Sequence, residues 1–394
     1  MLHTTMKAVP PIEQRPPLLF FCHDGLRFGR SARAALLAAL STHFRISAIA
    51  ESAAVAGAEL APEIELVYLP APGSFVSRNA RRQTIIDAYR RVDPAVVIIE
   101  QYPFGCGEFS DEVVSVLEAA AANPRTRLVA CSVVETLVDL PFQLSRRDDL
   151  VPRVADRYFD AVLVHADARL GRLEDAFGPN SLRVPVLYTG FIATAANAIA
   201  SDAAPPVRPS ALVTCDSARP DPALFRAALA ACDQWQPSDR LPLRIVAGPA
   251  LPDRELASLQ ADAARLADVV VERSAGDLRI GADTVALSIS DGACDTVFEM
   301  LRAGVPGLVV VGGWGDVERT EWAHRLASIG VVTLLERDRL SGVSLAGQVT
   351  ATILRPPPYV ELNRSGAEET LKILIRLADP AAAYVNAAIR AEAV

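Results

Sequence analysis

A short polar segment in the second half of the chain carries the residue types best suited to hold a ligand. This segment, Ser290–Glu299, follows a strongly apolar run and precedes a helical pattern. Gly292 permits a tight turn in which backbone N–H groups approach a ligand, while Asp295 and Thr296 open a helix whose positive end favours an anion. Glu299 follows Thr296 by three residues, so both side chains lie on one face of the first turn. The pattern predicts a nucleotide-holding element at the carboxyl end of a strand.

A purely structural interpretation of the same residues stays open. Thr296 and Glu299 have the spacing of a capping box, in which the two side chains only satisfy backbone donors at the start of a helix. The isolated motif does not decide between a ligand site and a helix cap.

Short apolar runs alternate with helical patterns from Leu18 onward. Fully apolar strands separated by helices indicate a parallel sheet that is covered by helices on both faces. In the first half the predicted strands are Leu18–Cys22, Arg45–Ala50, Ile64–Leu69, Ala95–Glu100, Arg127–Cys131, Ala161–His165 and Val184–Tyr188, and the predicted helices are Ser31–Leu40, Asn79–Arg91, Ser110–Ala122 and Asp167–Phe177. This half is therefore predicted to form one doubly wound α/β domain.

The same alternation restarts after a segment rich in Ala, Ser and Pro, which we interpret as a linker. The second set of strands comprises Ala211–Cys215, Leu243–Ala247, Asp268–Glu272, Val285–Ile289, Leu308–Val311 and Val331–Leu335. Their helices are Pro222–Cys232, Arg254–Leu266, Thr296–Ala303, Glu318–Ile329 and Val343–Leu354, and the tail adds Ala367–Leu377 and Ala381–Ala393. We expect a second doubly wound domain, and a ligand cleft between the carboxyl ends of the two sheets.

These patterns divide the chain into five parts. Residues 1–17 are predicted to be a disordered leader, 18–192 the first domain, 193–209 the linker, 210–378 the second domain and 379–394 a last helix. The leader has no apolar core and is therefore not expected to be a targeting peptide. Pro380 interrupts the helical tail, which would let the last helix cross back to the first domain; the alternative is a helix that finishes covering the second sheet.

Composition narrows the classes of function. The chain has 394 residues, of which 51% are hydrophobic and 22% charged, with a net charge of -8, so we expect a soluble acidic protein without a general attraction to nucleic acid. Its six cysteines form no Cys-x-x-Cys pair and fit a reduced, cytosolic protein. Its five histidines lack metal-ligand spacing, so no metal site is expected.

Several further pieces, in order and spacing, resemble one family over nearly the whole chain. The pieces are Cys22–Asp24 with Gly29, Val97–Gly105, Tyr188–Gly190, Val246–Pro249, Ser290–Glu299 with Ala303–Pro306, and Arg325–Gly330. Together they resemble GT-B glycosyltransferases, specifically bacterial enzymes of the family 28 type related to the lipid-linked N-acetylglucosaminyltransferase of peptidoglycan synthesis. The resemblance implies a fold of two Rossmann-like domains that face each other across a cleft.

The resemblance also implies a reaction. A sugar would be transferred with inversion, without a metal or a resident cofactor, from a nucleotide diphosphate donor such as a UDP-sugar to an acceptor glycan, lipid or small molecule, as in polysaccharide biosynthesis. The second domain would bind the donor, with Glu299 accepting hydrogen bonds from the ribose hydroxyls. The turn near the diphosphate would comprise Gly292, Ala293, Asp295 and Thr296, and Gly248 would lie on a second loop.

Inverting transfer also needs a general base in the first domain to take the proton of the acceptor hydroxyl. His23 and Asp24 follow the first predicted strand and are two base candidates; Glu100, which ends the fourth strand, is the third. The alternative for His23 and Asp24 is that they only tie their loop to neighbouring backbone.

Several positions depart from the family pattern. Arg27 replaces the first glycine of the first loop, and Arg30, after Gly29, replaces its histidine; an arginine can hold phosphate but cannot act as a base. Ala293 and Asp295 replace a glycine and an asparagine of the donor turn. The added carboxylate is unfavourable near a diphosphate unless Arg30 or Arg319 offsets its charge.

These departures keep two other functions open. A non-catalytic homologue would retain the two-domain shell as a binding or partner subunit. A nucleotide-sugar 2-epimerase has a similar shell but needs further carboxylates and histidines in the cleft.

Arginines gather on one predicted helix of the first domain, at positions 78, 81, 82, 90 and 91. Such a helix face can contact an anionic membrane surface. The alternative is an ordinary solvated face. The predicted location is therefore cytoplasmic, with peripheral contact at the inner face of the membrane as an option.

Overall fold

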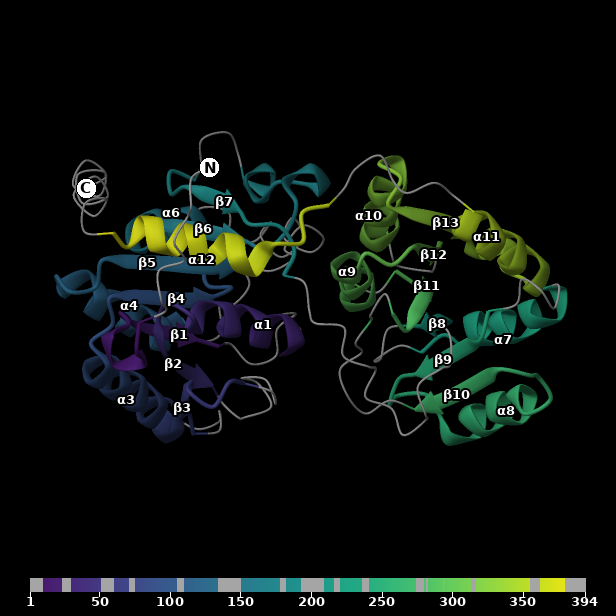
Figure 1. Ribbon diagram of the computed structural model, residues 1–394, viewed down its shortest axis with the longest axis horizontal. Helices are drawn as coiled ribbons and strands as arrows, with labels where there is room; N and C mark the ends of the chain where they lie inside the picture. The colour runs from purple at the N-terminus through teal and green to yellow at the C-terminus, as the bar shows by residue number, and fades with distance from the viewer. Residues whose placement is uncertain are drawn as a thin grey trace, which may run out of the picture. The chain divides into compact units, whose positions relative to one another are not determined.

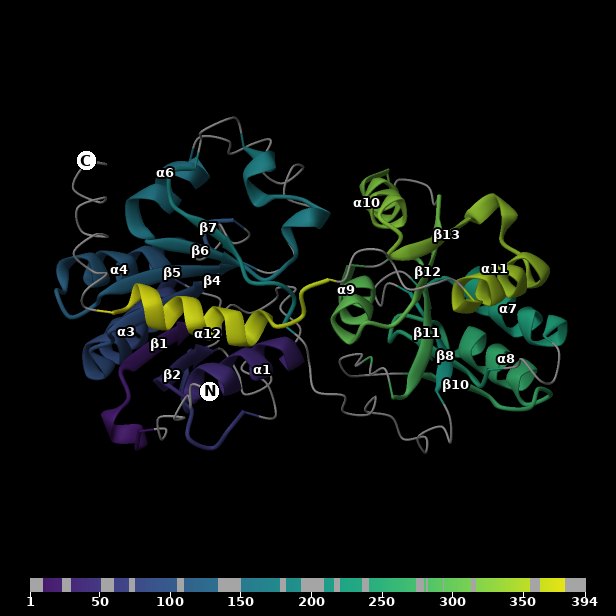
Figure 2. The ribbon, with the colours of Figure 1, turned by 45° about the horizontal axis from the view of Figure 1, so that its top comes forward.

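The computed structural model describes residues 10–22, 30–50, 60–70, 75–104, 110–133, 150–177, 182–192, 209–215, 220–235, 241–273, 280, 283–292, 294–312, 317–354 and 362–379. The chain divides into two compact units. The first comprises Met1–Ala193 and Asn363–Val394, and the second comprises Thr194–Leu362. Each unit is built on one parallel sheet (Figures 1 and 2).

The first unit contains a seven-stranded sheet in the order β3-β2-β1-β4-β5-β6-β7, with every neighbouring pair parallel. Most of its strands are buried on both faces, which explains their unbroken apolar sequences. The order reverses between β1 and β4, and the carboxyl ends of the strands at such a point are where open α/β sheets bind ligands. The strands are β1 (Pro17–Phe21), β2 (Arg45–Ala50), β3 (Glu65–Tyr68), β4 (Val96–Glu100), β5 (Leu128–Val133), β6 (Ala161–Val164) and β7 (Val186–Tyr188).

Helices cover this sheet. They are α1 (Arg30–Ser41), α3 (Phe75–Val92), α4 (Ser110–Ala122), α6 (Leu150–Tyr158) and α12 (Gly366–Leu377). Figures 1 and 2 show α1 and α12 side by side on one face of the sheet, where both pack on a core that includes Leu18 and Phe20. The helices α3 and α4 pack against each other.

The second unit contains a six-stranded parallel sheet in the order β10-β9-β8-β11-β12-β13. This order is that of a dinucleotide-binding fold, with its switch point between β8 and β11. The strands are β8 (Ser210–Thr214), β9 (Leu243–Ala247), β10 (Val269–Arg273), β11 (Val285–Ser290), β12 (Gly307–Val311) and β13 (Val332–Glu336). The helices are α7 (Pro222–Ala231), α8 (Asp253–Ala263), α9 (Cys294–Ala303), α10 (Val317–Ser328) and α11 (Gly342–Leu354). The predicted fold class of two doubly wound domains is therefore confirmed.

The second unit ends earlier than the predicted boundary at residue 378. The helix α12 belongs to the first unit because its apolar residues Ala367 and Leu374 complete the core beneath α1. Its entry is tightly fixed: the N–H of Phe191 donates to the carbonyl of Asn363 at 2.7 Å, and the N–H of Gly366 donates to the carbonyl of Phe191 at 2.9 Å. The chain thus returns to the first unit with α12, one helix before the last helix that was predicted to cross back. That predicted helix, 381–393, lies outside the described residues.

The N-terminal prediction also needs correction. The described part of the predicted leader, residues 10–17, contains a 3-10 turn at Ile12–Gln14 and the start of β1 at Pro17. Arg15 fixes this segment by donating hydrogen bonds to the carbonyls of Pro10, at 2.9 Å, and Ser41. A side chain that pairs two carbonyls removes the freedom expected of a disordered leader, and residues 1–9 lie outside the described part.

Two helix predictions differ from the structure. The predicted helix 167–177 is instead a pair of 3-10 turns, Ala168–Leu170 and Leu173–Ala176, because Gly171 between them has a φ of 151° and ends the first turn. The helix α6 was not predicted. Pro152 lies in its first turn, where a residue without an N–H is tolerated.

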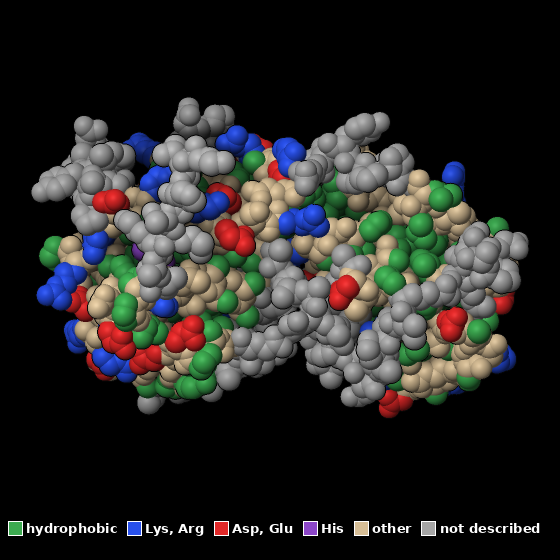
Figure 3. Space-filling model, in the orientation of Figure 1, with side chains coloured by type: hydrophobic (Ala, Val, Ile, Leu, Met, Phe, Trp, Pro, Cys, Tyr) green, Lys and Arg blue, Asp and Glu red, His purple; other side chains and the backbone are tan. Residues whose placement is uncertain are grey.

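Among the described residues, no helix is long and apolar enough to cross a membrane. Figure 3 shows acidic and basic side chains interspersed on the face in view.

Candidate functional site

Three of the predicted donor residues, Gly292, Thr296 and Glu299, follow β11 at the switch point of the second sheet. The strands β8 and β11 are neighbours, and the turn after β11 leads directly into α9 (Figure 1). Thr214, the last residue of β8, donates from its hydroxyl to the hydroxyl of Thr296 at 3.2 Å. Both threonines are buried, so this contact fixes the first turn of α9 against the end of β8.

Gly292 forms the turn itself. Its φ of 80° lies in the left-handed region, and a Cβ at this position would lie 3.0 Å from Cγ1 of Val309. The position therefore requires glycine for both conformation and space. The N–H of Gly292 donates to the hydroxyl of Ser290 at 3.3 Å. Of the other turn residues, Ala293 lies outside the described residues, and only the backbone of Asp295, in α9, is described.

Glu299 lies one turn further along α9 and is only 6% exposed. Its Oε1 accepts a hydrogen bond from Nη1 of Arg302 at 2.5 Å, and Arg302 is itself buried. Burial lowers the pKa of Arg302 to about 9, so the guanidinium is still charged at neutral pH. Arg302 was not predicted from the sequence, although an arginine three residues after a glutamate on one helix face is a recognisable ion-pair signal.

Arg319 lies beside the turn. Nη1 of Arg319 is 3.5 Å from Oδ2 of Asp291. Its aliphatic part packs on the turn, since a Cβ on Gly292 would lie 3.4 Å from its Cγ. The residue therefore faces the acid that precedes the turn. Its position relative to Asp295 is not described.

Gly248 follows β9 and is buried in a turn that an arginine holds in place. The N–H of Leu251 donates to the carbonyl of Gly248 at 3.2 Å. Arg273, at the end of the neighbouring strand β10, donates to the carbonyls of Pro249 and Leu251 at 2.6 and 2.7 Å and to Asp253 at 2.8 Å. This brace was not predicted from the sequence.

The turn after β8 lacks glycine, and a carboxylate lies at the helix start that follows it. Oδ1 of Asp221 accepts the N–H groups of Ala223 and Leu224 at 3.2 Å each, which caps α7. Oδ2 of the same residue accepts a hydrogen bond from Nη1 of Arg337 at 2.6 Å. The N-terminus of α7 is therefore satisfied by the protein's own anion.

In the first unit, Glu100 lies at the switch point next to β1. Arg33 of α1 forms a bidentate ion pair with it, from Nε to Oε1 at 2.7 Å and from Nη2 to Oε2 at 2.9 Å. The two side chains are 2% and 1% exposed. Burial raises the pKa of the neighbouring Cys22 thiol, and the charge of Glu100 raises it further. Arg33 is another residue that the sequence analysis missed.

The other predicted residues of the first unit are mostly outside the described part. His23, Asp24 and Gly29 are not described. Arg30 begins α1, and only its backbone is described. Their roles stay predictions.

A buried polar network was not predicted at all. Nε2 of His165 is 2.9 Å from the hydroxyl of Ser132, and its Nδ1 is 2.8 Å from Thr189 and 3.4 Å from Thr370. These residues join the ends of β5, β6 and β7 to α12. Burial lowers the pKa of His165 to about 3, so the imidazole is neutral at physiological pH.

No group of three or more His, Cys, Asp or Glu side chains suited to a metal ion occurs in the part of the chain that the structure describes.

No protein-family model matches the sequence, and no curated protein matches it. Solved structures are similar in fold. The calicheamicin glycosyltransferase CalG4 has a TM-score of 0.54 at 14% identity, covering 95% of this chain and 98% of that one. The glycotransferase of kitacinnamycin has a TM-score of 0.56 at 13% identity, covering 95% and 99%. A transferase from Siraitia grosvenorii in complex with UDP has a TM-score of 0.53 at 13% identity, covering 94% and 97%.

These similarities extend over nearly the full length of both chains, and they agree with the two parallel sheets and the switch points described above. The chain therefore has the GT-B fold that these glycosyltransferases share.

Proposed function

We propose that this chain is a glycosyltransferase that moves a sugar from a nucleotide diphosphate donor to an acceptor hydroxyl, with inversion and without a metal. The observation that carries the proposal is the cluster of Gly292, Thr296 and Glu299 at the switch point of the second sheet, where doubly wound domains bind nucleotides. One structure of the same fold was solved with UDP, which supports a nucleotide ligand.

In this proposal the donor diphosphate lies at the start of α9. The turn at Gly292 lets backbone N–H groups approach the phosphate oxygens, and the positive end of the helix favours their charge. Thr296 adds a hydroxyl that is already oriented by Thr214. Glu299 accepts hydrogen bonds from the ribose, and Arg302 holds its carboxylate in position.

The acceptor hydroxyl then attacks the anomeric carbon of the sugar. A new carbon–oxygen bond forms as the bond to the diphosphate breaks, and the electron pair of that bond leaves with the nucleoside diphosphate. The proton of the hydroxyl passes to a base, for which His23 and Asp24 are the proposed residues. Fixed dipoles that stabilise a departing anion are among the largest contributions to such catalysis.

Glu100 takes a different role in this proposal. Both its oxygens accept hydrogen bonds from Arg33, so the carboxylate is already engaged in a buried ion pair. We propose that the pair positions the start of α1 and the loop that carries His23 and Asp24. We place the reaction in the cytoplasm, in keeping with the buried thiols of Cys22, Cys131, Cys215 and Cys232.

The test is release of nucleoside diphosphate from a panel of nucleotide sugars, measured with and without a mixture of hydroxyl acceptors. Acceptor-dependent release that Glu299→Gln reduces supports the proposal. Conversion of the donor sugar to an isomer without any acceptor would indicate an epimerase. Failure of every nucleotide to bind would indicate a non-catalytic homologue.

A further inference from the structure

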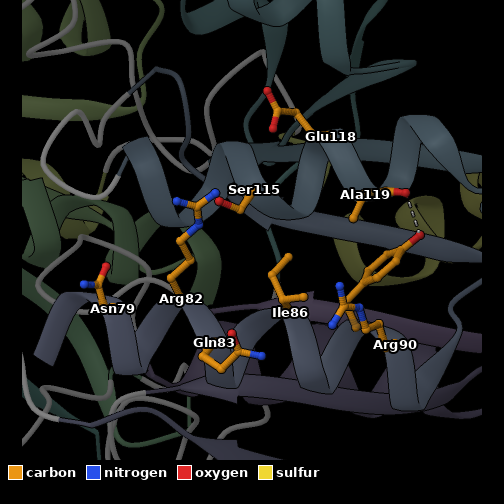
Figure 4. A pocket seen from close by; sticks show the side chains of 9 residues that line it. Asn79, Arg82, Gln83, Ile86, Arg90, Ser115, Glu118 and Ala119 are labelled. Atoms are coloured by element: carbon orange, nitrogen blue, oxygen red, sulfur yellow. Dashed lines mark hydrogen bonds between the residues drawn. The ribbon is translucent and has the colours of Figure 1, made fainter. Parts of the chain in front are cut away.

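A groove of about 800 Å³ runs between α3 and α4 in the first unit, a volume within the usual range for ligand sites. Figure 4 shows its residues in two rows, one from each helix. The row on α3 is Asn79, Arg82, Gln83, Ile86, Tyr89 and Arg90, and the row on α4 is Ser115, Glu118 and Ala119.

The groove is held open by contacts beneath it. At one end, Nε of Arg81 donates to both oxygens of Glu112, at 2.9 and 3.1 Å, and both side chains are buried. At the other end, the hydroxyl of Tyr89 lies 3.4 Å from the carbonyl of Ala119 and 2.8 Å from the hydroxyl of Thr126. These contacts fix the spacing of α3 and α4, so a ligand would enter a preformed site.

The structure separates the arginines of α3 into two groups. Arg81 is buried in its pair with Glu112, and Arg91 pairs with Glu65 at 2.7 Å, so neither belongs to an open cationic face. Within the described residues, Arg82 has no acidic partner within 4 Å, and Arg90 has only Asp87 at 3.9 Å. Of the five arginines predicted to cluster, Arg81 and Arg91 are therefore neutralised by ion pairs. Arg82 and Arg90 remain available to a ligand and line the groove.

These two guanidinium groups define a spacing. Arg82 and Arg90 are eight positions apart, which corresponds to roughly 12 Å along a helix axis. Figure 4 shows Arg82 reaching across toward Ser115, while Arg90 lies at the far end of the α3 row. A ligand that pairs an anionic group with each arginine would therefore be elongated and carry those groups at separated positions.

The remaining lining suits hydroxyl groups. Asn79 and Gln83 offer amides, of which Gln83 already donates to Asp87 at 2.9 Å and keeps its carbonyl available. Ser115 offers a hydroxyl oxygen, since its proton goes to the carbonyl of Asp111. Glu118 is exposed, so its carboxylate can accept a hydrogen bond from a hydroxyl at the rim.

We propose that this groove binds an acidic oligosaccharide, with Arg82 and Arg90 contacting two of its carboxylate or phosphate groups and the amides contacting its hydroxyls. The start of α3 follows β3 and the start of α4 follows β4, so the Asn79 end of the groove lies toward the carboxyl edge of the first sheet. The inference that the bound glycan is the acceptor, or an extension of it, rests on the proposed function.

The experiment titrates the full chain, without nucleotide, with tetragalacturonate and with neutral maltotetraose in a calorimeter. Tetragalacturonate should bind and maltotetraose should not. Arg82→Gln and Arg90→Gln should each weaken binding by at least about threefold, and by about tenfold together, as expected for exposed charge pairs. Arg376→Gln is the matched control, because Arg376 is an exposed arginine of the same unit outside the groove.

An equal loss with Arg376→Gln would mean a general charge effect and would overturn the proposal. So would equal binding of the two sugars, or no binding of either. Vesicles of phosphatidylglycerol and phosphatidylcholine form a further arm. Binding to vesicles that depends on Arg82 and Arg90, without binding of tetragalacturonate, would identify a membrane as the partner instead. Since no nucleotide is present, failure of the donor site would leave these results unchanged.

Discussion

Thr214 and Thr296 are 82 residues apart in the sequence, and their hydroxyl oxygens lie 3.2 Å apart at the carboxyl edge of the second sheet. The contact joins the end of β8, one of the two strands at which the sheet order reverses, to the first turn of α9. It therefore fixes the helix start of α9 at the place where this fold binds nucleotides. The two residues differ in one respect that can be tested. Only Thr296 belongs to the helix whose N-terminus is proposed to hold phosphate.

Replacing Gly366 with alanine should destabilise the first unit. A Cβ at Gly366 would clash with the carbonyl oxygen of Gly190 and lie 2.8 Å from the carbonyl carbon of Phe191. We expect a loss of about 1–3 kcal/mol, as for other overpacked sites. Gly347→Ala is the control, because no atom lies within 4 Å of its added methyl group and alanine favours the helix. Hydrogen exchange of α12 and β7 would report the change, and equal exchange in the two variants would contradict the packing described.

His165 should make the first unit sensitive to acid. Its pKa is lowered by burial to about 3 in the folded state, whereas the unfolded chain takes up the proton near 6.5. The folded state is therefore fully stabilised above pH 6.5, and this contribution falls by about 1.4 kcal/mol per pH unit from there toward pH 3. Denaturant unfolding at several pH values should give a shallower loss for His165→Gln than for the unaltered protein. If stability fell equally steeply with pH in the two proteins, the pKa of His165 would be the same in the folded and the unfolded state.

The ion pair of Arg33 and Glu100 should behave as one unit. Arg33→Met leaves a buried carboxylate without its bidentate partner and should cost about 3–5 kcal/mol, and Glu100→Met should cost a similar amount. The double variant should recover much of this loss because no uncompensated charge remains. A double-mutant cycle, followed through hydrogen exchange of β1 and β4, measures the coupling. Strict additivity of the two losses would rule out the pairing.

Arg273→Ala should loosen the turn that carries Gly248. The change removes hydrogen bonds to two carbonyls and to Asp253, so we expect faster hydrogen exchange at residues 249–253 and a stability loss of about 1–3 kcal/mol. Arg226→Ala, which removes the exposed ion pair with Glu255, is the control and should cost about 0–1 kcal/mol. If the turn exchanged equally in both variants, Arg273 would not be its brace.

Much of the fold was predictable because parallel strands are short apolar runs. Every predicted strand occurs in the structure, with ends that shift by about two residues at most. The local structure at Gly171 and Pro152 was harder to predict, since each changes a helix boundary through one residue. The amphipathic pattern of α12 showed that it has an apolar face, but a pattern cannot tell which of two sheets that face covers.

Sequence spacing related the candidate site residues to one another only where they are close in the chain. Gly292, Thr296 and Glu299 lie within one turn and one helix start, so spacing alone related them. Other candidate residues have partners that come from different strands or helices. Glu100 pairs with Arg33, the Gly248 turn is held by Arg273, and Thr296 contacts Thr214. Their roles depend on strand order, which the apolar pattern does not contain.

The central claim is that the start of α9 holds the diphosphate of a nucleoside diphosphate. It is tested most directly by calorimetric titration of UDP and the other nucleoside diphosphates into the unaltered protein, Thr296→Val and Thr214→Val. Both variants lose the same hydrogen bond, but only Thr296→Val removes a hydroxyl from the helix start. We predict that one nucleotide binds, that Thr296→Val weakens it about tenfold, and that Thr214→Val weakens it much less. Equal affinity in all three proteins, or no binding of any nucleotide, would contradict the claim.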